Sequence, residues 1–308
     1  MIKMNNRIYG VIGIGSYMAN WNADFTNQPK TLGNGMIFGS DKALKYSIRN
    51  HMVNNNEKVM YYKTFKDEKG KLQPLSLDEK YEMTFGDKIE KGKKIEEILR
   101  NLFSATDVIN FGATYAGKVN IGILGIVQIG QAFNKYDNTE IHTQSILSPF
   151  RDGTKEGADA TTLGTHTITD EAHYVYPFAV NPKVINNYKE IIPDLSYSFE
   201  DYNKFKVGAL EGATLLNTVN KMGCENEVGV FIILKENSEL YIPALDSYVE
   251  IFKDDKIIYD FTQLTNLLKT ITDEIKEAEL FYNPLKIKLK GIDDFNYNIK
   301  NIVTKKAL

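Results

Sequence analysis

A short apolar strand, a long polar loop and an amphipathic helix follow one another over residues 7–52, and this order constrains the fold more than any other stretch. The strand spans residues 7–15, and the loop extends to Gly39. Ser40 stands where a helix N-cap belongs, and Asp41 follows in the first turn, where a carboxylate is favourable. We therefore expect a helix that begins after Ser40 and packs on a sheet.

The expected helix has two distinct stripes. Apolar residues repeat every four positions at Leu44, Ile48 and Met52. Basic residues lie about a quarter turn round from them, since a helix advances about 100° per residue: these are Lys42, Lys45 and Arg49. Residues 1–56 hold six Lys and Arg against two Asp, a net charge of +4. The basic stripe is either a solvated face or a surface for an anionic partner.

Charge is segregated along the chain. The whole chain carries −3, and its pI near 5.9 alone argues against a nucleic-acid-binding protein. Residues 190–282, however, carry 18 acidic against eight basic residues, whereas residues 283–308 carry six Lys against two Asp. This distribution permits a basic face elsewhere. The acidic block is either solvated or meets another subunit or another copy of the chain.

Length and composition bound the class of protein. A chain of 308 residues with 43% hydrophobic and 25% charged residues is globular. Its single cysteine excludes an internal disulfide, and its four histidines show no metal-ligand spacing, so we expect neither a metal nor another cofactor. We find no signal peptide and no apolar run of about 20 residues, so no membrane association is expected. A cytoplasmic location fits these features.

The middle of the chain predicts an insertion and a long hairpin. Residues 58–75 have the pattern of a hairpin at the rim of the fold. Residues 66–102 contain its turn and then a charged, helix-prone stretch, which indicates an inserted helical subdomain. Glycines interrupt a β-branched run over residues 110–135, which favours strands with bulges over a helix. Residues 119–180 are expected to form a hairpin whose polar tip, near 143–169, projects from the body.

The C-terminal half predicts alternating helices and strands. Ser198 and Asp201 resemble a capping box at the start of a helix. A buried strand is expected from Val228 onward. A second helix is expected to open at Asp260 and to keep one apolar face as far as Ala278. Alternating Lys and apolar residues then indicate a final strand.

The order of these elements indicates an α+β fold. A strand, a helix, strands, an insertion, strands, a helix and a strand are compatible with a ferredoxin-like core enlarged by insertions. We expect one elaborated domain over residues 1–308. A doubly wound parallel sheet is the alternative, but the hairpins outside the core favour antiparallel pairing.

Three further features of the sequence each have a simpler, structural explanation. The glycines between Gly10 and Gly15 lack the third glycine of a dinucleotide-binding fingerprint, because Met18 occupies its place. Asp24 is either a turn-forming residue or a carboxylate that activates a nucleophile. Trp21, the only tryptophan, is either a core residue or a platform for base stacking.

Four blocks resemble a known family in the same order. Residues 40–49, Ser-Asp-Lys-Ala-Leu-Lys-Tyr-Ser-Ile-Arg, are similar to the first-helix signature Thr-Asp-x-x-Leu-Lys-x-x-Ile-Arg of the CRISPR-associated Cascade backbone subunit. Residues 107–113, residues 125–135, and Gly164 together with residues 172–182 resemble the later blocks. The chain is therefore identified as a member of this "Cas seven" family of the RAMP superfamily, with type I-B as the most similar subtype.

The resemblance implies an RRM-like palm, helical fingers, a β-hairpin thumb, and copies that stack head to tail along a guide RNA. It implies that Lys45 and Arg49 contact guide phosphates and that Leu163 lies at the tip of the thumb, where it wedges between bases. The chain departs from the family pattern at Tyr46 and at Gln131–Ala132. The full set of candidate RNA-binding residues is Trp21, Asn22, Lys42, Lys45, Arg49, Gln128, Asn134, Lys135, Arg151, Leu163 and His166.

Three hypotheses for function follow. The first is a non-enzymatic subunit that binds crRNA within a Cascade antiviral complex, with other subunits and target DNA, paired to the guide, as further partners. Contacts to phosphates and 2′-hydroxyls would leave the guide bases free to pair. The second is a RAMP-type endoribonuclease with Asp24 as the acting carboxylate. The third is an α+β protein with a small-molecule site.

Overall fold

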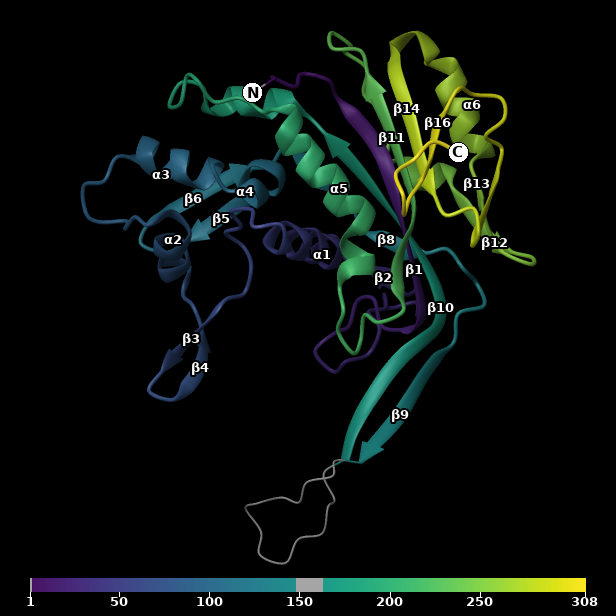
Figure 1. Ribbon diagram of the computed structural model, residues 1–308, viewed down its shortest axis with the longest axis horizontal. Coiled ribbons are helices and arrows are strands. Elements are labelled where there is room, and N and C mark those ends of the chain that lie inside the picture. The colour runs from purple at the N-terminus through teal and green to yellow at the C-terminus, as the bar shows by residue number, and fades with distance from the viewer. Residues whose placement is uncertain (1, 148–162) are drawn as a thin grey trace, which may run out of the picture.

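The computed structural model describes residues 2–147 and 163–308, and its centre is a large sheet. The strand order within the described residues is β16-β14-β11-β1-β10-β8-β2 (Figure 1). Strands β7 and β9 also pair with β10. All of these pairs are antiparallel except β14 with β16, so a doubly wound parallel sheet is wrong. The bounds are β1 Ile8–Ala19, β2 Phe38–Gly39, β7 Val127–Ile129, β8 Ala132–Asn134, β9 Ile141–Leu147, β10 Leu163–Val180, β11 Cys224–Leu234, β14 Ile275–Tyr282 and β16 Asn298–Asn301.

Strand β1 lies between β10 and β11 at the centre of the sheet. Its glycines make room for buried side chains of other elements. A Cβ atom on Gly13 would lie 2.6 Å from the hydroxyl of Tyr259, and one on Gly15 would collide with the carboxylate of Glu227. The glycine pattern of this strand is therefore a packing requirement.

Two helices, α1 Asp41–Asn54 and α5 Phe199–Leu215, pack together against the sheet (Figure 1). The predicted apolar stripe of α1 is confirmed: Leu44, Ile48 and Met52 are buried in one core cluster with residues of α5. Helix α5 begins with the predicted capping box, in which the Asp201 amide donates to the Ser198 hydroxyl at 3.1 Å. The 3₁₀ helix η1 Pro182–Tyr188 precedes α5.

A C-terminal lobe covers a second core cluster. It holds a three-stranded sheet and two short 3₁₀ helices beside α6, with bounds η2 Leu245–Tyr248, β12 Glu250–Lys253, β13 Ile257–Asp260, α6 Thr262–Thr270, η3 Thr272–Glu274 and β15 Ile287–Lys290. The predicted helix from Asp260 to Ala278 is wrong in its second half. Residues from Ile275 onward form β14, which pairs with β11, so the backbone hydrogen bonds of this segment go to the sheet.

The segment between α1 and the large sheet forms a separate group of elements on one side of the body (Figure 1). Its bounds are β3 Phe65–Glu68, β4 Lys71–Pro74, α2 Leu77–Phe85, α3 Ile95–Phe103, α4 Thr106–Phe111, β5 Gly112–Ala116 and β6 Asn120–Leu124. The predicted hairpin over residues 58–75 is confirmed for β3 and β4, which pair from Phe65 opposite Pro74 to Glu68 opposite Lys71, but residues 58–64 form no strand. The amides of Met60 and Tyr61 donate instead to the buried carboxylate of Asp107.

Strands β9 and β10 form a two-stranded arm that projects from the body (Figure 1). Their register runs from Ile141 opposite Thr169 to Leu147 opposite Leu163. The rest of β10 returns into the large sheet beside β1. Residues 148–162, which belong to the expected tip, lie outside the described residues.

Candidate nucleic-acid interface

The start of α1 carries two of the predicted cations. The amine of Lys45 donates to the Asp41 carboxylate at 3.1 Å, and the side chain of Lys45 is only 13% exposed. The side chain of Lys42 is 86% exposed, and its amine lies 3.5 Å from the Asp41 carboxylate. Burial opposes ionisation of Asp41, but hydrogen bonds from Gln131 and Lys45 outweigh it and lower the pKa of this carboxyl. The stripe is therefore partly neutralised within the chain.

Arg49 is tied to a buried carboxylate. Its Nε donates to Asp107 at 3.0 Å, and Asp107 has no exposed side-chain surface. The same carboxylate accepts the amides of Met60 and Tyr61 at 2.8 and 2.9 Å. Because a buried carboxylate needs such partners, Arg49 has a structural role whether or not it also meets a phosphate.

The loop before α1 positions Trp21 and Asn22 inside the protein. Trp21 is 1% exposed, and its indole donates to the Tyr176 hydroxyl at 2.5 Å. The expectation that Trp21 stacks on a base is therefore corrected: its ring faces are covered by the core. Asn22 is also buried and accepts from the Ser40 hydroxyl at 3.1 Å, which fastens the loop to the start of α1.

Asp24 shapes its own loop. Its Oδ1 accepts from the Thr26 hydroxyl and amide and from the Gln28 amide, all at 2.8 to 2.9 Å. The hydrogen bond from the Thr26 hydroxyl is the main cause of a lowered pKa for this carboxyl. This geometry is that of a turn-forming aspartate. Within the described residues, no group of three or more Cys, His, Asp and Glu side chains is arranged to hold a metal ion.

The strand block places one of its three candidates at the surface. Gln128 on β7 is exposed, and its amide donates to the Gly125 carbonyl at 2.9 Å. Asn134 bonds the Thr139 hydroxyl and the His173 amide, so its side chain braces β8 against β10. The amine of Lys135 donates to two carbonyls of the C-terminal lobe at 2.6 and 2.8 Å, and burial lowers its pKa. These contacts make Asn134 and Lys135 framework residues.

The root of the arm is joined to the loop before α1. Gln28 of this loop donates to the Thr167 hydroxyl on β10 at 2.9 Å. His166 on β10 bonds the side chain of Asn220, in the segment between α5 and β11, at 2.9 Å. Arg151 lies outside the described residues, and only the backbone of Leu163 is described. The start of α1, its preceding loop and the arm thus form one continuous region.

A family model described as CRISPR-associated protein Cas7 matches residues 6–267. The chain belongs to the Cas7 family. A solved structure described as "CRISPR RNA-guided surveillance complex, pre-nicking" contains a chain that is similar to the Cas7 chain at 14% identity, with a TM-score of 0.54 over 97% of both chains. This shows a shared fold. A chain of a second structure, a "CRISPR RNA-guided surveillance complex", has 14% identity and a TM-score of 0.45 over 88% of each chain. No curated protein matches the chain.

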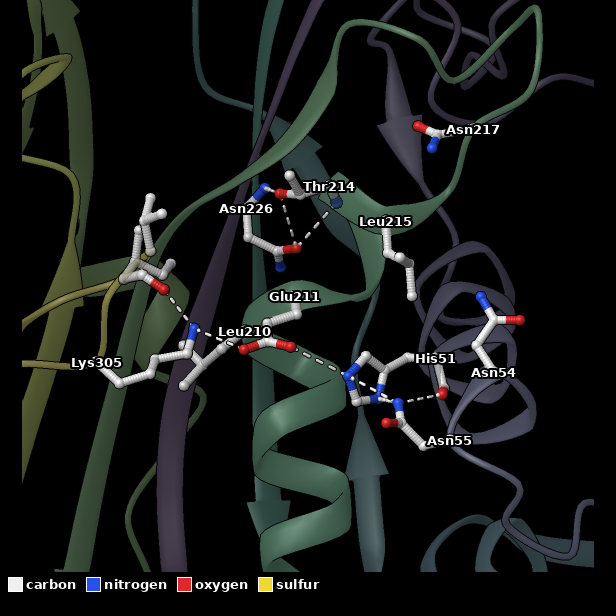
Figure 2. Close-up of a pocket in the computed structure, with 12 residues that line it drawn as sticks. His51, Asn54, Asn55, Leu210, Glu211, Thr214, Leu215, Asn217, Asn226 and Lys305 are labelled. Carbon is white, nitrogen blue, oxygen red and sulfur yellow. Dashed lines mark hydrogen bonds and ion pairs between the residues drawn. The ribbon is translucent and has the colours of Figure 1, made fainter.

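The Cas7 chain also has a cavity of about 570 Å³ between α1, α5 and the C-terminal segment (Figure 2). Glu211 of α5 joins its walls, because one carboxylate oxygen lies 3.1 Å from His51 Nε2 and the other 3.2 Å from Lys305 Nζ. Asn226 accepts the Ala213 amide near the end of α5 at 3.0 Å. No sequence-predicted candidate among the described residues lines this cavity.

Sequence reasoning missed a buried polar cluster at the centre of the Cas7 sheet. Glu227 accepts from Tyr17 at 2.5 Å and from Tyr259 at 2.7 Å, and it pairs with His173 Nδ1 at 2.7 Å. Glu171 bonds the other nitrogen of His173 at 3.3 Å. Gly15 was the available signal, since only a residue without a Cβ leaves room for the Glu227 carboxylate there.

Within the described residues, no helix is long and apolar enough to cross a membrane.

Proposed function

We propose that this Cas7 chain is the crRNA-binding backbone subunit of a type I CRISPR surveillance complex (Cascade), several copies of which stack along one guide. The observation that carries this function is the Cas7 family match over residues 6–267. Other Cascade subunits and, through the paired guide, target DNA are its further partners. We further propose that the complex is of subtype I-B and that the protein is located in the cytoplasm.

The strand order supports a ferredoxin-like palm. The arrangement β11-β1-β10-β8, with α1 after β1 and α5 between β10 and β11, has the connectivity of a split βαβ unit. In this proposal residues 1–308 form one elaborated domain. Residues 66–102 are the fingers insertion, and residues 119–180 contain the thumb hairpin with its tip near 143–169. Its strands are β9 and β10, because β6 within this range pairs with β5 instead.

We assign the guide to the surface that runs from α1 to the arm. Lys42, Lys45 and Arg49 face phosphates, Gln128 and His166 make polar contacts, and Arg151 and Leu163 act at the tip. Trp21, Asn22, Asn134 and Lys135 hold these elements in place. The pairs Lys45–Asp41 and Arg49–Asp107 reduce the net charge that these cations offer, so Lys42 contributes most to salt-dependent binding.

The chain acts without catalysis in this proposal. The alternative, an endoribonuclease that uses Asp24, finds little support because the Oδ1 atom of this carboxylate accepts three hydrogen bonds from its own loop. Incubating single-stranded RNA with Mg²⁺ and the purified chain separates the two. Intact RNA with both the parent and Asp24→Asn fits the backbone role, and cleavage that is lost in Asp24→Asn contradicts it.

RNA binding over a salt series tests the proposed surface. The parent is expected to bind fluorescent single-stranded RNA of guide length with an affinity that falls steeply with salt. Lys42→Ala should weaken binding and reduce the slope of log affinity against log salt by about 1. Lys276→Ala, at an exposed lysine on β14, is the matched control and should behave as the parent. Equal slopes for all three proteins would remove Lys42 from the interface.

A further inference from the structure

Two tyrosine rings are stacked at the surface of α1. Tyr46 comes from the helix and Tyr62 from the segment that leads into the β3–β4 hairpin, and their ring centroids lie 5.7 Å apart with planes 12° from parallel. Tyr46 is 44% exposed, so one of the largest apolar side chains of α1 is open to solvent. The pair therefore adds an exposed aromatic surface next to the basic stripe.

The pair is held in a fixed orientation. Asn50, one helical turn after Tyr46, donates its side-chain amide to the Tyr62 hydroxyl at 2.9 Å. A ring fixed in this way loses little further conformational freedom when a ligand stacks on it. The ring pair is thus preorganised to stack against a planar ligand.

Cations flank the tyrosines on both sides. Lys42 lies one turn before Tyr46 on α1 and is exposed. Lys63 follows Tyr62 and is exposed, with its amine 4.9 Å from the ring centroid of Phe65. A hollow of about 300 Å³ adjoins Tyr62 and is lined by Lys63 and Lys80, among other residues.

Exposed aromatic rings between cations are the means by which proteins hold single-stranded nucleic acid without reading its sequence. Binding of phosphates alone would need only the lysines and not an exposed aromatic ring. We propose that Tyr46, supported by Tyr62, is a stacking platform for a base of single-stranded RNA, with Lys42 and Lys63 on the adjoining phosphates. This inference rests on the proposed guide-binding function and adds a base contact to a surface assigned above to phosphates.

The test compares the 308-residue parent with Tyr46→Ala, Tyr46→Leu and Tyr46→Phe. Phe252→Ala is the control, at an exposed ring of the C-terminal lobe. Affinity for guide-length single-stranded RNA is measured over a salt series. Tyr46→Ala and Tyr46→Leu should each bind about 5- to 100-fold more weakly with an unchanged salt slope. Tyr46→Phe and Phe252→Ala should match the parent. An abasic ribose-phosphate strand of equal length should bind parent and Tyr46→Ala alike.

The outcomes separate this inference from the proposed function. Steep, salt-dependent binding by the parent with no loss in Tyr46→Ala overturns the platform and leaves the function standing. Loss in Tyr46→Phe as large as in Tyr46→Ala also overturns it, because the phenylalanine ring can still stack. A parent that binds no RNA overturns both. Tyr46→Leu keeps apolar bulk on α1, so a loss in both Leu and Ala variants with retained thermal unfolding supports stacking.

Discussion

At the residue scale, the Asp107 carboxylate anchors Arg49 of α1 inside the protein. It is fully buried and accepts Arg49 and two backbone amides. Removing it leaves the arginine and both amides without their acceptor, so Asp107→Ala should lower the free energy of unfolding by about 2–4 kcal/mol. Denaturant titration measures this loss.

Asp194→Ala is the matched control for this variant. Asp194 also pairs with an arginine, Arg100, but its side chain is 72% exposed. Exposed pairs contribute little. An Asp107→Ala midpoint as close to the parent as that of Asp194→Ala would show that the buried pair is dispensable.

His173 makes the free energy of unfolding depend on pH. Burial alone would lower its pKa, but the charge of Glu227 and hydrogen bonds to Glu227 and Glu171 outweigh it and raise the pKa. Because the folded-state pKa lies above the unfolded value of about 6.5, the contribution is full below that pH. It is lost as pH rises through the folded-state pKa. We expect the parent to lose more stability between pH 6 and pH 9 than His173→Gln does.

Other groups in the cluster must be considered in that measurement. Burial opposes ionisation of Glu227, but His173 and the two tyrosine hydroxyls outweigh it and lower its pKa, so its own contribution is lost at acidic pH instead. Burial and Glu227 raise the pKa of Tyr17 and Tyr259, which stay neutral across this range. Urea titrations at each pH provide the comparison. An identical pH dependence in parent and His173→Gln would contradict the assignment.

At the element scale, the capping box of α5 should be measurable. Ser198 is 3% exposed, and its hydroxyl donates to Asp201 at 2.6 Å and accepts the Asp201 amide. Ser198→Ala should cost about 1 kcal/mol of unfolding free energy. Ser104→Ala, at an exposed serine after α3, should cost less. Equal midpoints for the two variants would mean that the box does not stabilise α5.

Local signals explain which elements the sequence predicted. The stripe of α1 and the capping box of α5 depend on residues within one or two turns, and both helices were found. The helix expected as far as Ala278 failed because the second half of its apolar face is equally suited to a strand. This segment is a strand because it pairs with β11, about 45 residues earlier, and tertiary pairing of that kind overrides local propensity.

The candidate site was predictable to the same extent. Periodicity placed Lys42, Lys45 and Arg49 on one side of α1. The sequence did not indicate that Arg49 pairs with Asp107, which lies 58 residues away, or that Trp21 is buried and donates its indole N–H to the Tyr176 hydroxyl. Such long-range contacts decide whether a side chain is free to bind RNA, and they cannot be predicted from the spacing of residues in the sequence.

At the scale of the whole molecule, copies of this chain are proposed to stack along one RNA. Identical copies that repeat one contact along an RNA each cover the same length of it, so the number of bound copies should increase with RNA length. The acidic block over residues 190–282 and the basic segment over residues 1–56 permit a head-to-tail contact between copies, which does not close on itself.

Counting the copies bound to single-stranded RNAs of increasing length is the most direct test, with native mass spectrometry as the measurement. Doubling the RNA length should about double the number of bound copies, as expected of a repeating head-to-tail contact. A duplex of the same length should bind fewer copies, because its bases are not open to the surface of α1. One copy on every RNA regardless of length, or no RNA-bound chain at all, would contradict the stacking of copies along one RNA.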